Sequence, residues 1–316
     1  MKTFIKSPIN YTGNKYRLLE QFKKYLPDNV DTFVDLFCGG ATVGFNVEAK
    51  HVILIDSNPR VISLLKTLAE SPIEKIIKDI EALIEKYKLS YSYKYGYAYY
   101  REAGFVVGNN GLKKYNEEGY KTLRTDYNSL KNKNSYKANI MLYTLMVYAF
   151  NNDIRFNSNG EFNLPVGKTD FNKNNLNKLI DYNNRAKEIS YEFICSDFTD
   201  KKVKEKIFNA DFVYCDPPYL ITTAVYNENN GWNEKNEEEL LRLLSEVNDK
   251  NIKFALSNVL KKEGKTNILL ETWIKENNFK KNNINYHYRS SSYNKKNRNS
   301  NEEEILVTNG ERNENK

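Results

Sequence analysis

Short apolar runs and longer amphipathic stretches divide the chain into three parts. Two runs rich in β-branched residues, at 31–37 and 51–56, stand near its start. Runs of this length, bounded by Gly, Pro, Asn or Asp, are typical of buried β-strands. Similar runs return in the last part of the chain, at 190–197, 210–216, 252–257 and 304–308. Both ends of the chain are therefore predicted to supply strands to one sheet.

Turn signals follow the first two runs. Gly39 and Gly40 follow the first run, which predicts a tight turn and then a helix. Asn58-Pro59 follows the second run and marks the start of another helix. This order predicts a βαβ unit of a doubly wound α/β sheet, in which ligands bind beyond the carboxyl ends of the strands.

The middle of the chain has helical periodicity. We predict an α/β sheet domain formed by residues 1–57 and 185–316, with a mostly helical domain, residues 58–184, inserted between its second and third strands. A stretch rich in Tyr, Gly and Asn, at 91–115, lies inside the inserted domain. Amphipathic patterns occur at 73–87, 120–130 and 136–150.

Charge and composition narrow the class of protein. The 316 residues include 48 Lys and Arg against 41 Asp and Glu, and the net charge of +7 would attract a polyanion, although many proteins of this charge bind none. Three cysteines without a C-x-x-C pair and two histidines argue against a disulfide framework and a zinc site, so no metal is expected. The longest apolar run, 140–150, is shorter than the ~20 residues that span a bilayer, and residues 1–8 hold no apolar signal-peptide core. We expect a cytoplasmic protein without membrane contact.

The most specific chemical signal is Asp216-Pro217-Pro218-Tyr219, directly after an apolar run. The prolines fix two φ angles, so the carbonyl oxygen of Pro217 is held beside the Asp216 carboxylate. Two fixed acceptors can take both hydrogens of an exocyclic amino group, while the Tyr219 ring lies against the base. Such hydrogen bonds favour a pyramidal nitrogen whose lone pair can attack an electrophilic methyl group. Taken alone, the tetrapeptide could also be a Pro-Pro turn with an Asp cap.

A second signal is Gly39-Gly40 together with Asp56 at the end of the next apolar run. Glycines let a ligand approach the backbone, and a carboxylate at that strand end can bind ribose hydroxyls. The chain has neither G-x-G-x-x-G nor G-K-[ST] here, which disfavours a nicotinamide cofactor and a P-loop NTPase. Combined with the Asp216 turn, this favours a methyl donor that carries adenosine.

Residues 154–164 predict a β-hairpin, because alternating segments flank the turn residues Ser158-Asn-Gly160. A two-stranded ribbon fits the DNA major groove, and an arginine near its tip can bond guanine O6 and N7, which contributes ~1–3 kcal/mol of discrimination. Arg155 is the candidate for this contact. Without a nucleic-acid partner, the same pattern is a surface hairpin whose arginine meets solvent.

Five separated motifs stand at residues 11–15, 34–40, 150–167, 211–219 and 253–259. In sequence and in order they resemble the DNA adenine methylase (Dam) family, in particular its phage-encoded members. The resemblance implies a Rossmann-like S-adenosylmethionine-dependent methyltransferase sheet with an inserted DNA-recognition domain, of the alpha group. It further implies methyl transfer from S-adenosyl-L-methionine to N6 of a flipped adenine in double-stranded DNA, at a GATC-type site.

The resemblance also implies a setting and site residues. A monomer or weak dimer in a bacterial cell or a phage-infected host is expected, with a cognate restriction endonuclease as a candidate partner. Asp56 would hold the ribose, and Asp197 would lie near the adenine of the cofactor. The catalytic residues would be Asp216, Pro217, Pro218 and Tyr219. The cofactor would be bound by Tyr11, Lys15, Asp35, Phe37, Gly39, Gly40, Asp56, Asp197 and Asp216. DNA would be contacted by Asn151, Asn152, Ile154, Arg155, Asn157, Arg289, Lys295 and Lys296.

Alternative functions stay open at this point. One is a DNA-binding regulator that keeps the fold but has lost catalysis, against which the intact Asp216 turn argues. Another is methylation of a different amino group: protein-glutamine enzymes favour Asn at the head of the turn and cytosine-N4 enzymes often favour Ser, so Asp216 favours adenine. The Tyr-rich stretch, 90–115, departs from compact family members, and another branch of the family reads longer sites than GATC.

Two further features have structural interpretations. The acidic runs 237–239 and 302–304 are predicted to be solvated faces. Cys38 and Cys215, which flank the candidate site, are predicted to be small packing residues rather than nucleophiles.

Overall fold

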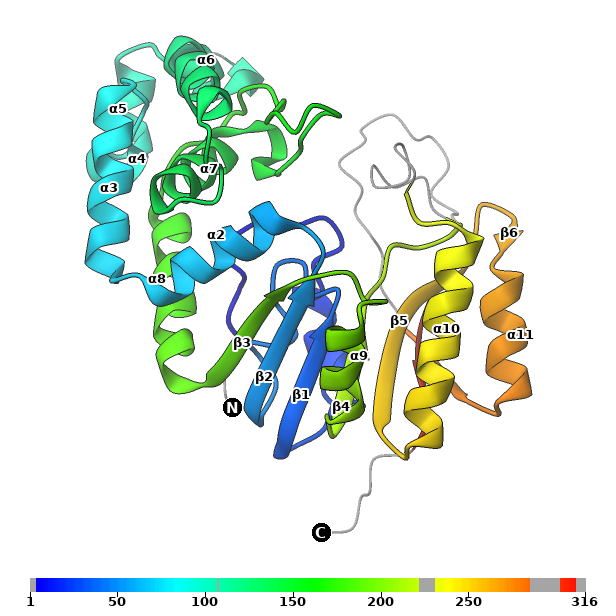
Figure 1. Ribbon diagram of the computed structural model, residues 1–316. Coiled ribbons are helices and arrows are strands. Elements are labelled where there is room, and N and C mark those ends of the chain that lie inside the picture. Colours follow the sequence, from blue (N-terminus) through cyan, green and yellow to red (C-terminus); the bar gives the residue numbers. More distant parts are fainter. Residues whose placement is uncertain (1–3, 107, 222–230, 285–301, 311–316) are drawn as a thin grey trace. The chain divides into compact units, whose positions relative to one another are not determined.

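The computed structural model describes residues 4–106, 108–221, 231–284 and 302–310 (Figure 1). The chain forms two compact units. The first consists of Met1–Tyr16, Gly39–Phe45 and Asn58–Phe193, and the second of Arg17–Cys38, Asn46–Ser57 and Ile194–Lys316. The predicted division into a catalytic and a target-recognition domain stays a prediction.

The sheet has the strand order β3-β2-β1-β4-β5-β8-β7, and β6 pairs with β5. Strands β2, β1, β4 and β5 are parallel neighbours, whereas β8 runs antiparallel to both β5 and β7. This confirms the predicted mostly parallel, Rossmann-like α/β sheet, with its helical insertion between β2 and β3. The strands are β1 (Val30–Leu36), β2 (Ala49–Asp56), β3 (Ser190–Cys195), β4 (Phe212–Cys215), β5 (Lys253–Lys262), β6 (Lys265–Thr266), β7 (Lys280–Asn283) and β8 (Glu303–Thr308).

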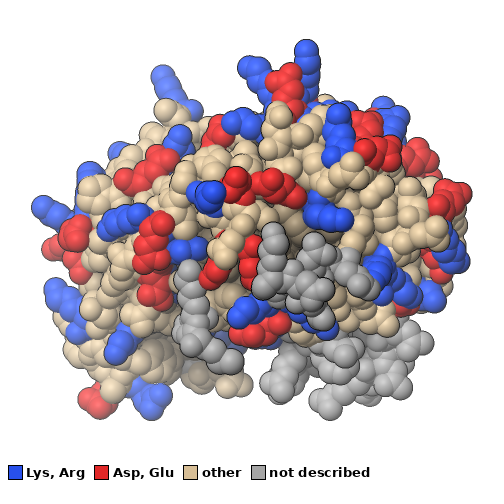
Figure 2. Space-filling model, turned by 90° about the horizontal axis from the view of Figure 1, so that it is seen from below, with Lys and Arg blue, Asp and Glu red and all other residues tan. Residues whose placement is uncertain are grey.

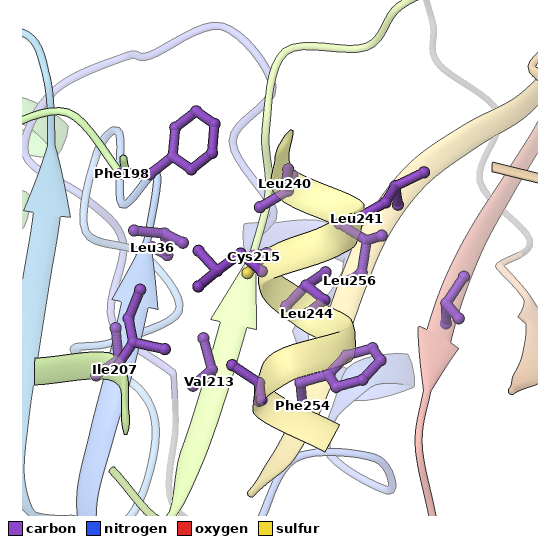
Figure 3. Packing of buried hydrophobic residues seen from close by; sticks show 14 of the residues in the cluster. Leu36, Phe198, Ile207, Val213, Cys215, Leu240, Leu241, Leu244, Phe254 and Leu256 are labelled. Atoms are coloured by element: carbon purple, nitrogen blue, oxygen red, sulfur yellow. The ribbon is translucent and has the colours of Figure 1, made fainter. Parts of the chain in front are cut away.

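Helices α9 (Lys201–Phe208), α10 (Glu234–Asp249) and α11 (Ile268–Glu276) cover one face of the sheet in the second unit (Figure 1). On β4, the alternate residues Val213 and Cys215 point toward these helices and form a buried hydrophobic cluster with Leu244 of α10 (Figure 3). On the opposite face of β4, Tyr214 contacts Phe22 of α1 (Leu19–Phe22), with ring centroids 6.0 Å apart. Because both faces are covered, the central strands are continuous apolar runs, as parallel strands buried on two sides require.

The first unit is mostly helical and is organised around α7 (Tyr136–Tyr148), which is buried from Ala138 to Tyr148. Helices α2 (Pro59–Glu70), α3 (Ile73–Lys86) and α6 (Lys113–Ser129) pack against it. Local signals define the helix starts: the Asn58 side chain accepts hydrogen bonds from the N–H groups of Arg60 and Val61, beside a proline in the first turn. The other helices of this part of the chain are α4 (Ser92–Tyr95), α5 (Tyr97–Glu102) and α8 (Lys173–Glu188), and the 3-10 turns are η1 (Tyr16–Leu18), η2 (Gly108–Asn110) and η3 (Phe150–Asn152).

The helix predicted after the glycine turn does not form, and that prediction was wrong. Residues 39–46 make successive turns instead. Gly39 and Ala41 have φ angles of +48° and +56°, and left-handed residues cannot continue a right-handed helix. Within the first unit this turn packs tightly, since a Cβ at Gly39 would lie 2.8 Å from the Tyr11 ring and one at Gly40 would lie 2.9 Å from Oγ of Ser7.

The predicted hairpin is confirmed. Phe156 and Phe162 pair as an antiparallel bridge, and the N–H of Asn157 donates to the carbonyl of Glu161 at 2.9 Å. Gly160 has a φ of +71°, which explains why glycine closes this turn.

Charges of both signs are mixed on the face of the molecule drawn in Figure 2. Lys and Arg side chains are interspersed with Asp and Glu over the face drawn in Figure 2, so the positive charge is not gathered into one patch there. None of the helices in the described residues combines the length and apolar character that crossing a bilayer requires.

Candidate functional site

A pocket in the second unit opens at the carboxyl ends of β1, β2 and β4. It encloses about 670 Å³, part of which is open to solvent. Ligands of doubly wound sheets bind at this edge. The described residues that line it are Leu36, Phe37, Ile55, Asp56, Ser57, Ser196, Asp197, Phe198, Pro218, Gly231, Trp232 and Asn236.

Three aromatic rings form one wall of the pocket, here called the aromatic wall (Phe37, Phe198 and Trp232). The Phe37 centroid lies 5.4 Å from that of Phe198 and 5.5 Å from that of Trp232, and the last two are 5.7 Å apart. Phe37 has a φ of +65°, which is costly for a side chain of this size. Such strain is concentrated at functional sites, and it turns the chain sharply at the end of β1.

Carboxylates supply the polar part of the pocket. Asp56 ends β2, and Asp197 follows β3. Oδ1 of Asp197 accepts from the N–H and the hydroxyl of Thr199, at 2.9 and 2.6 Å, which fixes that side chain. Among the described lining residues none is Lys or Arg, so the pocket suits a neutral or cationic ligand with hydroxyl groups better than one with phosphates.

The Asp216 turn adjoins this pocket. The Asp216 N–H donates to the carbonyl of Leu36, at 3.3 Å, and Leu36 and Pro218 both line the pocket. The Tyr219 hydroxyl donates to Oδ1 of Asp216, at 2.9 Å. The head of the turn is thus tied to the end of β1, and its carboxylate is oriented by its own aromatic residue.

The two buried cysteines fit their predicted role as packing residues. Burial raises the pKa of the Cys38 thiol well above its usual value, and the nearby carboxylates of Asp56 and Asp35 raise it further. Burial likewise raises the pKa of Cys215, with smaller contributions from Asp35 and Asp216. Both side chains are therefore held as thiols, which are poor nucleophiles. The described residues contain no cluster of His, Cys, Asp and Glu able to hold a metal ion.

The structure brings Phe37, Asp56, Asp197 and Pro218 together in one pocket. Asp35 is buried in β1, 1% exposed. Tyr11, Gly39 and Gly40 lie together in the first unit, as do Lys15 and Gly13. Lys15 is 3% exposed and donates to the Gly13 carbonyl at 2.9 Å, so it is not a solvated lysine.

The predicted DNA-reading residues lie on the hairpin and just before it, in the first unit. Arg155 is exposed, and its Nε donates to Oδ1 of Asn163 across the hairpin at 2.9 Å. Asn157 is engaged in the turn, because its Oδ1 accepts from the N–H groups of Asn159 and Glu161. The side chain of Asn152 donates to Oγ1 of Thr169 at 2.9 Å.

Strained backbone precedes the hairpin. Asn151 and Asn152 have φ angles of +58° and +54°, which redirect the chain between α7 and Ile154. The predicted DNA contacts Arg289, Lys295 and Lys296 lie outside the described residues.

Sequence reasoning missed several lining residues, above all Phe198 and Trp232. Phe198 directly follows the predicted Asp197. Trp232 stands immediately before Asn233, whose side chain caps α10 by accepting from the Asn236 N–H. The N-cap pattern Asn233-x-x-Asn236 could have marked this helix start, yet nothing in the pattern indicates that the preceding tryptophan faces a pocket.

Comparison with known proteins gives a consistent result. A family model described as D12 class N6 adenine-specific DNA methyltransferase matches residues 11–301. The type II methyltransferase M.FokI of Planomicrobium okeanokoites is 39% identical over 97% of this chain and 43% of that protein. Modification methylase StsI of Streptococcus sanguinis is 35% identical over 98% of this chain and 44% of that protein.

A lower identity links the chain to the DNA adenine methylase of Escherichia coli K12, 24% over 79% of each protein. The chain therefore spans less than half the length of M.FokI and StsI, and most of the length of the E. coli protein.

Proposed function

Because this chain belongs to the D12 class N6 adenine-specific DNA methyltransferase family, we propose that it transfers a methyl group from S-adenosyl-L-methionine to N6 of an adenine in duplex DNA. The observation that carries the proposal is the Asp216 turn beside the pocket. The backbone N–H of Asp216 is hydrogen-bonded to the carbonyl of Leu36, and Pro218 of the same turn lines the pocket. An amino group held by the turn would therefore lie next to a bound methyl donor.

The residues of the pocket fit such a donor. A nucleoside needs an apolar slot for its base and acceptors for its ribose hydroxyls, and the aromatic wall and the Asp56 carboxylate offer both. The carboxylates of Asp56 and Asp197, without Lys or Arg among the described lining residues, favour a cationic ligand. S-adenosyl-L-methionine would supply an electrophilic methyl group on a sulfonium centre.

The protein's own part in the reaction is to hold the target nitrogen. We assign the Asp216 carboxylate and the Pro217 carbonyl to the two N–H groups of the adenine, and the Tyr219 ring to its face. Hydrogen bonds to both N–H groups localise the nitrogen lone pair, and a fixed orientation reduces the entropy lost on approach. Reaching the amino group in this way requires the adenine to leave the base stack.

The remaining site residues are assigned on the family resemblance. Residues 1–57 and 185–316 would bind the cofactor and carry catalysis, and residues 58–184 would recognise DNA. Arg155 would read one guanine through O6 and N7, with GATC as the proposed type of site. Cofactor contacts are also proposed for Tyr11, Lys15, Asp35, Gly39 and Gly40, and DNA contacts for Asn151, Asn152, Ile154 and Asn157.

The biological setting is part of the proposal. Two relatives are named as a type II methyltransferase and a modification methylase, which supports a cognate restriction endonuclease as partner. We place the protein in the cytoplasm of a bacterial cell or infected host, as a monomer or weak dimer.

The test is incubation of the purified chain with tritium-labelled cofactor and unmethylated duplex DNA, followed by nucleoside chromatography. Label in N6-methyldeoxyadenosine is expected, and none is expected with the Asp216→Ala variant. Label only in methylcytosine or in protein would contradict the assignment. Methylation-sensitive sequencing of DNA from cells that express the chain would then give the recognition site.

A further inference from the structure

Glu237 is a buried carboxylate that the catalytic proposal does not use. It lies in the first turns of α10, in a run of glutamates predicted to be a solvated face, and that prediction is wrong for this residue. Glu237 is 0% exposed, whereas its neighbour Glu238 is exposed. A buried carboxylate is costly unless it is well hydrogen-bonded, so its presence calls for a specific role.

Three side-chain N–H donors from three different segments converge on Glu237. Nδ2 of Asn267, the N-cap of α11, donates to Oε1 at 2.8 Å, and Nδ2 of Asn258 on β5 donates to the same oxygen at 3.2 Å. The indole Nε1 of Trp232 donates to Oε2 at 2.5 Å. Burial raises the pKa of Glu237, and these three hydrogen bonds lower it in part.

The third donor connects this network to the pocket. Trp232 lines the pocket, and its ring contacts Phe37 edge-on and Phe198 at a tilt. The side-chain oxygens of both asparagines accept from backbone: Oδ1 of Asn267 accepts from the Leu270 N–H, which caps α11, and Oδ1 of Asn258 accepts from the Val259 N–H on β5. The two hydrogen bonds on Oε1 therefore connect α10 to β5 and to the start of α11, and the one on Oε2 fixes the indole in the aromatic wall.

We propose that Glu237 is a positioning residue for the cofactor site, which fixes the Trp232 indole so that its ring completes the aromatic wall. This inference rests on the proposed function, since it assumes that the pocket binds S-adenosyl-L-methionine. A carboxylate suits the task because both of its oxygens accept. A glutamine in its place has one accepting oxygen, which can accept from the two asparagines. Its own N–H groups then face the indole N–H of Trp232, where no acceptor is left.

The experiment measures equilibrium binding of S-adenosyl-L-methionine to four variants by isothermal titration calorimetry. Glu237→Gln and Trp232→Phe are each expected to weaken binding about five- to tenfold, the loss that follows removal of one buried hydrogen bond. The double variant is expected to lose no more than either single variant, because both changes break the same bond. Glu238→Gln, which removes the same charge from an exposed neighbour, is the matched control and should bind as the wild type does.

A spectroscopic readout separates positioning from general stability. Trp232 and Trp273 are the two tryptophans of the chain, so in a Trp273→Phe background the fluorescence reports Trp232 alone. Acrylamide should quench it more strongly after Glu237→Gln and equally before and after Glu238→Gln. A purely structural role would lower the melting temperature without changing the quenching or the affinity of the folded protein, and that result would overturn the inference.

The outcomes also separate this inference from the function on which it rests. If the wild-type protein binds no S-adenosyl-L-methionine, the proposed function fails. If the wild type binds and the single variants bind equally well, or if their losses add in the double variant, the positioning role fails. Should Glu237→Gln not fold, Trp232→Phe decides, because it leaves the bonds to Asn258 and Asn267 in place.

Discussion

The Tyr219 hydroxyl donates a 2.9 Å hydrogen bond to Oδ1 of Asp216, three residues earlier in the chain. The proposed reaction uses the same carboxylate, each of whose two oxygens can accept more than one hydrogen bond, to hold the amino group of the base. The hydroxyl therefore has two opposite effects: it orients the carboxylate, and it competes with the substrate for it.

These effects make the ring and the hydroxyl of Tyr219 separable. Tyr219→Phe keeps the ring, and turnover should stay within about tenfold of the wild type. The variant loses the hydrogen bond that orients the Asp216 carboxylate, but it also loses the hydroxyl that competes with the substrate for this carboxylate. Tyr219→Ala also removes the stacking surface, worth ~1–3 kcal/mol for a base, and should lower turnover about tenfold further or more. Single-turnover methylation rates check both, and equal rates for the two variants would contradict stacking.

Asp216→Ala should abolish methyl transfer while leaving DNA binding intact. The carboxylate is proposed to grip the amino group, whereas duplex affinity is expected from phosphate contacts elsewhere. Methylation assays and fluorescence anisotropy with labelled duplex measure the two properties on the same preparation. Persisting activity would refute the gripping role.

Arg155→Ala should relax discrimination at one guanine by about 1–3 kcal/mol, as loss of a bidentate base contact does. The relevant measurement is the ratio of methylation rates on the cognate duplex and on duplexes changed at one base pair. Arg242→Ala, at an exposed arginine on α10 in the second unit, is the control and should leave that ratio unchanged. An unaltered preference after Arg155→Ala would remove this residue from base reading.

Asp170 should give the stability of the protein a measurable pH dependence. Its carboxylate is buried and accepts from the N–H and the hydroxyl of Ser92, at 2.7 and 2.5 Å. Burial raises its pKa, and the hydrogen bonds from Ser92 offset this only in part. The folded state therefore retains the proton to higher pH than the unfolded chain does, so this contribution is fully present below the unfolded pKa of about 3.9 and is lost as the pH rises through the folded pKa.

Urea unfolding of the wild type and of Asp170→Asn, across that pH window, tests this prediction. The stability of the wild type relative to the variant should fall as the pH rises. Asp181→Asn, at an exposed position on α8, is the control for the loss of a carboxylate elsewhere in the first unit. A constant difference between wild type and Asp170→Asn would mean that the pKa of Asp170 is not raised.

Gly119 lies in the interior of α6 with no room for a side chain. A Cβ there would lie 1.9 Å from the carbonyl oxygen of Tyr87, which is backbone and cannot rotate away. Gly119→Ala should therefore destabilise the protein by about 1–3 kcal/mol, despite the higher helix propensity of alanine. Thermal unfolding measures this, and a raised melting temperature would show that α6 can shift.

The parts of the fold that follow local rules were predictable. Asn58-Pro59 begins α2, the apolar run at 51–56 forms most of β2, and Gly160 closes the hairpin. Tertiary packing decided the rest. The Tyr11 ring leaves no room for a side chain at Gly39, and the left-handed φ angles of Gly39 and Ala41 prevent the helix predicted there.

Glu237 shows why a buried polar residue is hard to recognise. A run of glutamates has the composition of a solvated surface, yet position 237 shares a helix face with Leu240, Leu241 and Leu244, which are all buried. That spacing was a signal for burial, whereas the asparagines that make burial tolerable come from β5 and α11. No local pattern predicts partners contributed by distant segments.

The left-handed conformation of Phe37 links ligand affinity to thermal resistance. A glycine at position 37 would adopt this φ angle without strain, so contacts of the Phe37 ring must compensate for the conformational cost. A molecule that packs on that ring adds to those contacts only in the native state, which by mass action shifts the unfolding equilibrium. Occupied protein should accordingly melt at a higher temperature than empty protein, and a ligand packed on the ring would offset the conformational cost of Phe37.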